Sequence, residues 1–526
     1  MMNELKKTLD RNENMVLTEN GAVGYSTTGK SIVDLNFRVH SSHSNIDGTV
    51  LDLFKNALDE NYTDTVKWLF YLRDIREGLG ERDSFVCLFY NLYDRYPNMA
   101  VRLVPFIPEY GRWKDLIDLL DLNNSDDNLL SKTIYGFIEN QLKNDLISMA
   151  AGKPVSLAAK WMPSINASQK ARRVSCRLSK KLGLTCAGYR KMLSALRKYI
   201  DVTEVKTCGN RWSEIDYNRV SSNANVRYLH AFMKHDNQRR LKYLEDLFKP
   251  KTGATMHASV LYPYEVYAKY GNRFISTKRE SVQEDRSIEE LWKNLKDIPS
   301  IGNTLCVCDN SGSMDLDLPG TSARAIDVSR SLSIFFSERC KGEFKDKVIA
   351  FSSNPSFIDF SGCNSLADKV DVMNRHNDCT NTDIEKTFDL ILKMAVDNHL
   401  PQNELPENIL IISDMEFDCA TTYHAYHNVH NNIMSKYNTL FENIRNVWES
   451  YGYKLPRLVF WNVNSRSNAI QLTENECGVI LMSGFSVNNV KMILSGELDP
   501  YKALKSVLNS KRYDKIDKVL KEGNYL

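Results

Sequence analysis

The 526-residue sequence lacks any apolar run of the roughly 18 residues that a bilayer-spanning helix needs. Its first residues lead into polar sequence without the apolar core of a secretory signal. Its eleven cysteines are odd in number and scattered, and no two are spaced as CxxC. We therefore expect a cytoplasmic protein, in the host cytoplasm if the gene is viral, with no membrane partner.

Catalytic motifs are also missing. The sequence has no nucleophile elbow and no Ser, His and Asp in the order of a hydrolase triad. The ten histidines are scattered and give no general base with an evident partner. These absences favour a protein that is not an enzyme.

Acidic residues are absent from one long stretch. Residues 151–200 hold twelve Lys and Arg and no Asp or Glu, although the whole chain carries a net charge of only +2. A surface adapted only for solubility mixes both signs of charge, whereas a one-signed surface suits a polyanion. The sequence therefore predicts a contact with nucleic acid.

The length of the chain indicates several domains, because one hydrophobic core rarely serves more than ~250–300 residues. Helical spacing of apolar residues with short breaks predicts helical repeats, resembling HEAT repeats, over 48–298. We expect an irregular arm over 1–47, where Ile32 to Leu35 alternate as in a strand. A charged C-terminal helix is expected over 499–526.

Short apolar runs of the buried, parallel-strand kind alternate with helical segments over 299–498. This pattern predicts a doubly wound, Rossmann-like α/β domain, so that the fold class of the whole chain is α + α/β. The five runs cover residues 303–308, 347–351, 408–412, 457–461 and 478–482.

Oxygen-bearing side chains lie in three loops of this predicted α/β domain. Asp309, Ser311 and Ser313 form a DxSxS sequence after the first strand; Thr380 precedes a helix, and Asp414 ends another strand. Parallel strands bring such residues to one edge of the sheet, and hard oxygen ligands suit Mg²⁺. Thr382, on the same loop as Thr380, is a second choice. A plain turn that caps the next helix is the alternative.

The three loops, in this order, resemble the metal-ion-dependent adhesion site (MIDAS) of von Willebrand factor A domains. The resemblance implies that the five side chains named above bind a divalent cation as cofactor. It also implies that an acidic residue of a protein partner completes the coordination of the ion.

Two consecutive amphipathic segments carry the basic residues. Their apolar positions repeat at helical spacing, and the Lys and Arg side chains lie opposite them. We expect these outer faces to bind RNA phosphates, with affinity that depends on salt and little on sequence. Trp161 and Tyr189 are candidates for stacking on bases. The predicted RNA-binding residues are Lys170, Arg172, Arg173, Arg177, Lys180, Lys181, Arg190 and Lys191, and Arg197 and Lys198 extend the same face.

Four sequence segments carry a wider resemblance: LRDIREGLGER (72–82), IPEYGRWKDL (107–116), KWMPS (160–164) and SDMEFD (413–418). The chain is similar to the Ro-ribonucleoprotein (TROVE) family, in which a helical-repeat ring precedes a von Willebrand factor A domain. In detail it resembles a related, uncharacterised family of plant and large-virus proteins. The resemblance implies a scaffold that binds small, structured RNA.

Other functions remain open at this point. A metal-dependent protein adaptor, or a virion-associated protein without RNA, would use the same residues. The segment GYSTTGKS (24–31) satisfies the phosphate-loop pattern of an NTPase, but we expect no helix to follow it. Cys419, His424, His427 and His430 invite a zinc site, although their spacing favours a surface helix or loop.

Overall fold

The computed structural model describes residues 13–39, 48–123, 125, 127–249, 252–271, 282–318, 323–351, 354–376, 383–418, 439–467 and 469–522, except for the side chain of Lys170. The chain forms two compact units. The first comprises residues 1–62 and 258–509, and the second comprises 63–257 and 510–526. None of the described helices is long and apolar enough to cross a membrane.

The first unit is built on a six-stranded sheet with the order β5-β4-β3-β6-β7-β8. Every pair of neighbours is parallel except β4 and β5, which are antiparallel. This order places the first strand of the sheet, β3, in its interior, as in doubly wound folds. The strands are β3 (Thr304–Asp309), β4 (Lys347–Phe351), β5 (Ser356–Asp359), β6 (Asn408–Ser413), β7 (Arg457–Asn462) and β8 (Val479–Ser483).

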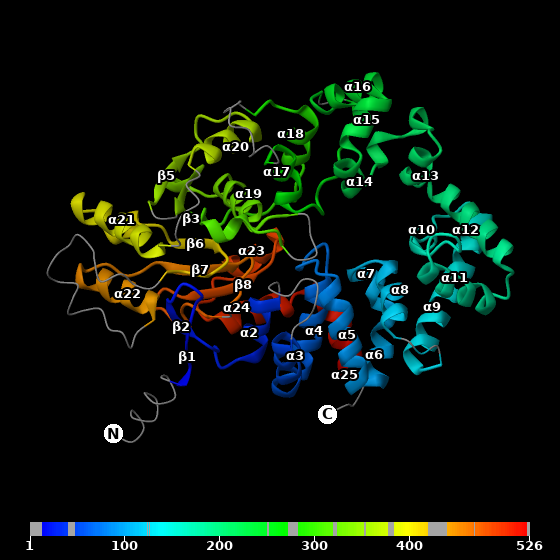
Figure 1. Cartoon of the computed structure of the whole chain (residues 1–526), viewed down its shortest axis with the longest axis horizontal. Coiled ribbons are helices and arrows are strands. Elements are labelled where there is room, and N and C mark those ends of the chain that lie inside the picture. The colour runs from blue at the N-terminus through cyan, green and yellow to red at the C-terminus, as the bar shows by residue number, and fades with distance from the viewer. Residues whose placement is uncertain are drawn as a thin grey trace. The chain divides into compact units, whose positions relative to one another are not determined.

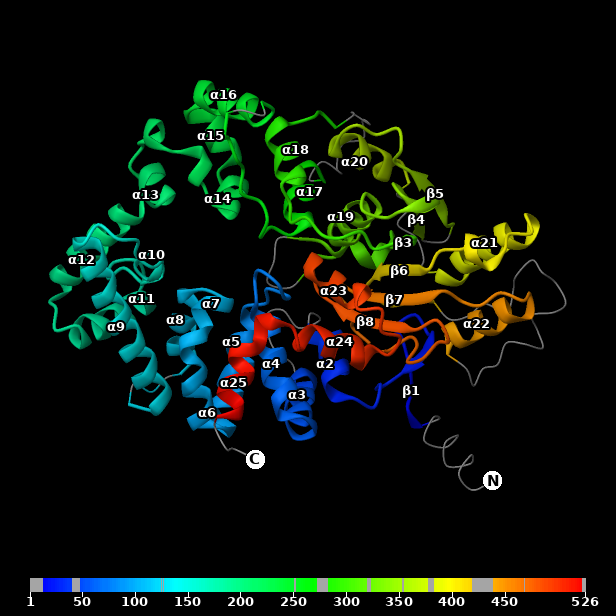
Figure 2. The same ribbon diagram turned by 180° about the vertical axis from the view of Figure 1, so that it is seen from behind.

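Helices cover both faces of this sheet (Figures 1 and 2). Successive residues of a strand point to opposite faces. In β7, Phe460 contacts Phe441 of α22 (Leu440–Ser450) at 4.8 Å between ring centroids, and Trp461 contacts Phe336 of α19 (Ala325–Ser337) at 5.3 Å. The helical region and the doubly wound sheet confirm the predicted fold class.

The remaining helices of this unit lie before, within and after the strands of the sheet in the sequence. Those before the sheet are α2 (Ser31–Arg38), α3 (Gly48–Glu60), α17 (Pro263–Gly271) and α18 (Arg286–Lys293). Those within or after it are α20 (Leu366–Arg375), α21 (Ile384–Asp397), α23 (Val490–Leu494) and α24 (Pro500–Leu508). The units therefore divide the chain differently from the predicted domains, because α17 and α18 pack with α19 and α20.

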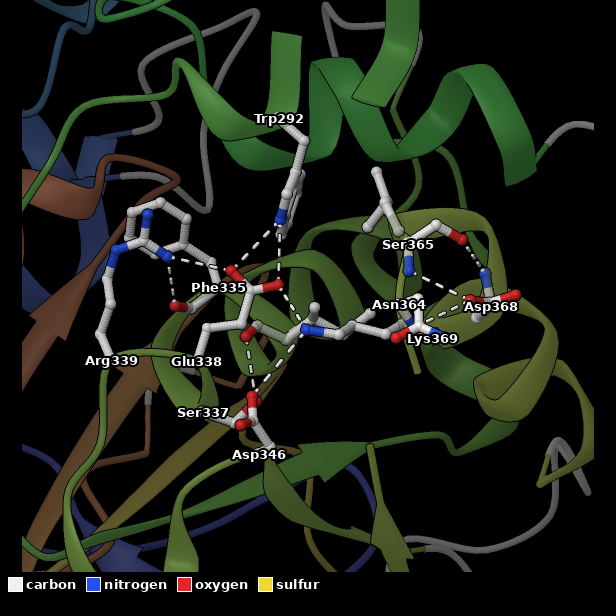
Figure 3. Close-up of polar contacts among 12 residues, drawn as sticks. Trp292, Phe335, Ser337, Glu338, Arg339, Asp346, Asn364, Ser365, Asp368 and Lys369 are labelled. Atoms are coloured by element: carbon white, nitrogen blue, oxygen red, sulfur yellow. Dashed lines mark hydrogen bonds and ion pairs between the residues drawn. The ribbon is translucent and has the colours of Figure 1, made fainter. Parts of the chain in front are cut away.

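A polar network joins α18, α19 and α20 (Figure 3). The Glu338 carboxylate, just after α19, accepts hydrogen bonds from the Trp292 indole at 3.1 Å and from the Lys369 ammonium at 2.7 Å. Ser365 and Asp368 form a capping box at the start of α20. The network fixes these three helices against one another, which makes it a structural feature of the unit.

The prediction of an irregular arm over 1–47 is wrong for its described part. Residues 13–39 form the hairpin of β1 (Met15–Leu17) and β2 (Val23–Tyr25), followed by helix α2. Ile32 to Leu35 are helical, although they alternate as in a strand. Seven of the eight residues of α2 are buried, and the buried polar residues Asp34, Asn36 and Arg38 alternate with apolar ones, which produces the strand-like pattern.

The second unit is helical, as predicted. Its members pack largely as sequence neighbours, for example α5 on α6 and α11 on α12. Arg512, just before α25, donates to the buried Asp74 carboxylate at 2.7 Å and lies over the ring of Tyr110. The helices are α4 (Tyr62–Arg73), α5 (Asp83–Arg95), α6 (Pro97–Leu103), α7 (Ile107–Tyr110), α8 (Trp113–Leu122), α9 (Leu129–Ala150), α10 (Ala158–Trp161), α11 (Gln169–Lys181), α12 (Cys186–Ile200), α13 (Thr203–Cys208), α14 (Ser222–Arg227), α15 (Leu229–His235), α16 (Asn237–Leu247) and α25 (Asp514–Lys521).

Candidate functional site

The predicted metal ligands lie at the carboxyl ends of two neighbouring strands. Asp309 is the last residue of β3, and Asp414 follows the last residue of β6, which pairs with β3 in parallel. Asp309 Oδ1 accepts a hydrogen bond from the Ser311 amide at 2.9 Å, and the Ser311 and Ser313 hydroxyl oxygens are 3.1 Å apart. These four side chains therefore gather at one edge of the sheet. Thr380 and Thr382 lie outside the described residues.

Burial controls the ionisation of the two carboxyl groups. It raises the pKa of Asp309 to about 7, and the neighbouring Asp414 charge adds to this rise. Burial also raises the pKa of Asp414 to about 6, while the nearby Ser313 hydroxyl and the Glu416 amide lower it. Two buried carboxylates with raised pKa values favour a cation between or beside them.

One oxygen of this cluster accepts no hydrogen bond from the described residues. Asp414 Oδ1 accepts from the Glu416 amide at 3.2 Å, but no described residue donates a hydrogen bond to the buried Oδ2. Arg466 lies 3.7 Å from Oδ2, within ion-pair range. Buried polar atoms normally have partners, and a set of carboxylate and hydroxyl oxygens fits a hard cation. The residues present therefore suit Mg²⁺.

Two residues of the SDMEFD segment for which no role was predicted, Ser413 and Glu416, hold this edge together. Ser413 donates to Asp309 Oδ2 at 2.5 Å and accepts from the Met415 amide. The fully buried Glu416 carboxylate accepts backbone amides of Glu19, at 2.9 Å, and of Arg466, at 2.7 Å. Glu416 therefore ties the loop after β6 to the N-terminal hairpin and to the loop after β7.

The basic residues divide into two groups in the structure. Arg172, Lys180, Lys181, Arg190 and Lys191 are exposed on α11 and α12, and in the described part of the chain none of them has an acidic partner. Lys198 is likewise exposed, and Lys170 lies in α11. Arg173 and Arg177 are half-buried, and Arg173 lies 3.5 Å from the Asp121 carboxylate. We call the five exposed side chains of the first group the basic surface.

Three residues that were considered for contact with RNA have contacts within the protein. Arg197 points inward and donates to the backbone oxygens of Ala159, at 2.9 Å, and Met162, at 2.6 Å. Tyr189 is fully buried, so it cannot stack on a base. Trp161 already lies under the Arg112 guanidinium, 4.9 Å from the ring centroid. The prediction of stacking by Tyr189 is therefore wrong.

The phosphate-loop segment GYSTTGKS (24–31) overlaps a strand and a helix, because β2 contains its first two residues and α2 begins at its last residue, Ser31, so the expectation that no helix follows it is wrong. Its backbone amides, however, are already used within the chain. The Thr28 amide donates to Asp34 at 2.9 Å and the Ser31 amide donates to Glu60 at 3.1 Å. Glu13 contributes to the lining of an open cavity of about 430 Å³ beside Thr27, Thr28 and Gly29. Carboxylates at the loop oppose a bound phosphate.

The first glycine of this pattern has a structural reason. A Cβ atom on Gly24 would lie 2.9 Å from the backbone oxygen of Ile470, because Tyr25 pairs with Ile470 in a β-bridge.

Among the described residues, no three His, Cys, Asp or Glu side chains come together as a metal site. Cys419, His424, His427 and His430, the candidates for zinc, lie outside the described residues.

Two family models match the chain. Residues 303–522 match a domain of unknown function, DUF7788, and residues 18–138 and 176–302 match another domain of unknown function, DUF2828. The first match begins just before β3 and contains Asp309 and Asp414. The second match contains most residues of the basic surface.

Two individual matches cover nearly the whole chain. The uncharacterized protein L728 of Acanthamoeba polyphaga mimivirus is 27% identical over 553 residues, which is 95% of this chain and 90% of that protein. The crystal structure of the Deinococcus radiodurans Ro (RSR) protein matches 91% of this chain and 99% of its own, with a TM-score of 0.47 and 13% identity.

Proposed function

We propose that the protein is a non-enzymatic RNA-binding scaffold whose basic surface holds RNA phosphates. The observation that carries this proposal is the set of five exposed Lys and Arg side chains on two adjacent helices, without acidic partners among the described residues. Such a surface binds a polyanion by releasing counterions. The resemblance of the sequence to Ro ribonucleoproteins makes small, structured RNA the expected ligand.

Charge reversal on the basic surface tests this function. We expect Arg190→Glu with Lys191→Glu to weaken RNA affinity and to lower the slope of log K against log salt by roughly 1.5, because each lost phosphate contact removes about 0.7–0.9. Lys132→Glu with Lys242→Glu, which reverses two exposed lysines without acidic partners among the described residues, is the matched control and should leave the slope unchanged. An unchanged slope in the first variant would refute the assignment.

The second part of the proposal concerns the edge of the sheet. Asp309, Ser311, Ser313 and Asp414 would hold Mg²⁺ or another divalent cation, and Thr380 belongs to the same set by the sequence resemblance. When bound, the ion supplies positive charge and a position for an oxygen ligand. We assign that position to a carboxylate of a protein partner or to an RNA phosphate. Asp414 Oδ2, to which no described residue donates a hydrogen bond, supports this assignment.

The same edge supports the second candidate function, a metal-dependent adaptor between proteins, including a virion-associated protein. Purification at low salt separates the two candidates. Structured small RNA that co-purifies and is sensitive to nuclease supports the scaffold. Protein that carries no RNA and fails to bind added RNA supports the adaptor. The carboxylates around GYSTTGKS leave the NTPase alternative without support.

A further inference from the structure

Two cysteines meet on the helical hairpin that carries the basic surface. The Sγ atoms of Cys176 and Cys186 are 3.9 Å apart. Cys176 lies in α11 and is half-buried, whereas Cys186 is the first residue of α12 and is exposed. A disulfide is about 2.05 Å long, so each sulfur has to move by only about 1 Å to form one.

We propose that Cys176 and Cys186 form a reversible disulfide by exchange with an anionic disulfide such as glutathione disulfide. The chain reverses between them through a short turn in which Gly183 has a φ of +64°, and this turn holds the two helix segments side by side. Cys306 and Cys340 also lie together, but both are buried. A dissolved oxidant reaches the exposed Cys186 but not the buried Cys306 and Cys340.

The charge around the pair selects the oxidant. Lys180, Lys181, Arg190 and Lys191 are exposed in the segments that flank the cysteines, with no acidic residue among them. Glutathione disulfide has a net negative charge at neutral pH because its four carboxylates outnumber its two ammonium groups. A one-signed basic surface raises the local concentration of such an anion and speeds its encounter with the thiol.

The exchange proceeds in two balanced steps. The Cys186 thiol, which is exposed, loses its proton and attacks one sulfur of glutathione disulfide, releasing one glutathione thiolate and leaving a mixed disulfide. The Cys176 thiol then loses its proton and attacks Cys186 Sγ, releasing the second glutathione. Two protein thiols give up two electrons and two protons, and glutathione disulfide becomes two molecules of glutathione.

Tryptic mapping of the full chain tests the proposal directly. Arg177, Lys180 and Lys181 lie between the cysteines, so trypsin separates Cys176 on peptide 174–177 from Cys186 on peptide 182–190. After treatment with glutathione disulfide and alkylation of the remaining thiols, we expect these two peptides to be joined. Their joint mass should be that of both reduced peptides less two hydrogen atoms, and dithiothreitol should separate them.

Three single variants complete the test. Cys176→Ser should stop the exchange at glutathione attached to Cys186, and Cys186→Ser should abolish the joined peptides. Cys208→Ser removes another exposed cysteine and should change nothing. Glutathione that stays on Cys186 in the wild-type protein would overturn the proposal, as would peptides that join either cysteine to Cys208. The disulfide forms whether or not the basic surface binds RNA, so either result stands apart from the RNA test.

Discussion

Replacing Asp309 by Asn should remove much of the pH dependence of stability that the two buried carboxyl groups create. The folded protein raises the pKa of Asp309 to about 7, whereas a carboxyl group in an unfolded chain titrates near ~3.9. The protonated form is therefore favoured in the folded state. Its contribution to stability is complete below a pH of about 4 and is lost as the pH rises through about 7.

The size of this pH dependence follows from the shift in the pKa of Asp309. Three pKa units correspond to about 4 kcal/mol, of which about 3 kcal/mol are lost between roughly pH 5 and pH 8. For a unit of this size, that loss lowers the melting temperature by roughly 6–10 °C. In the presence of a chelator, the melting temperature of the wild-type protein should therefore fall by roughly 6–10 °C more than that of Asp309→Asn between roughly pH 5 and pH 8.

Magnesium supplies the second arm of the same assay. An ion that binds only the folded state raises its stability, so Mg²⁺ should recover the melting temperature of the wild-type protein at pH 8. Asp309→Asn should show little recovery. Asp315→Asn, which changes an exposed carboxylate in the same loop, should behave like the wild-type protein. Equal pH slopes, or equal recovery by Mg²⁺, in Asp309→Asn and wild type would refute the reasoning.

Two further substitutions test contacts that stabilise the fold. Arg73→Ala removes the ion-pair partner that lies 2.6 Å from the fully buried Asp115, so it should lower the free energy of unfolding, measured with urea, by about 3 kcal/mol. Arg82→Ala removes an exposed ion pair and should lower the free energy of unfolding by less than about 1 kcal/mol. Gly24→Ala should lower the melting temperature, because its Cβ would meet a backbone oxygen at 2.9 Å, while Gly48→Ala, with open space around it, should not. A harmless Gly24→Ala would contradict the close backbone approach.

The sequence predicts those parts of the molecule whose pattern is local. Buried parallel strands are continuous apolar runs, so the ends of β3 and β6 could be read directly and Asp309 and Asp414 placed at one edge. Helix α2 was not predicted, because nearly all its residues are buried and its polar residues alternate with apolar ones as in a strand. Its polar residues are satisfied inside the protein, as where Asp34 accepts from the Thr28 amide.

Long-range hydrogen bonds could not be predicted. Glu416 bonds to the amide of Glu19, which is 397 residues away in sequence, and no periodicity signals such a contact. Arg197 sits at a position that a helical wheel assigns to the basic face, yet the segment that contains Ala159 and Met162 offers its backbone oxygens there. The division of α11 and α12 into exposed and structural basic residues therefore required the structure.

Comparing RNA affinity with and without Mg²⁺, in wild type and in Asp309→Asn, decides what completes the coordination of the ion. Mg²⁺ screens RNA phosphates in any protein, so only the difference between the two proteins reports on the site. If a protein carboxylate is the ligand, we expect equal Mg²⁺ effects in both, because the metal residues and the basic surface belong to different units. If an RNA phosphate is the ligand, Mg²⁺ should strengthen binding more in the wild type, and by reciprocity RNA should tighten Mg²⁺ binding by the same factor.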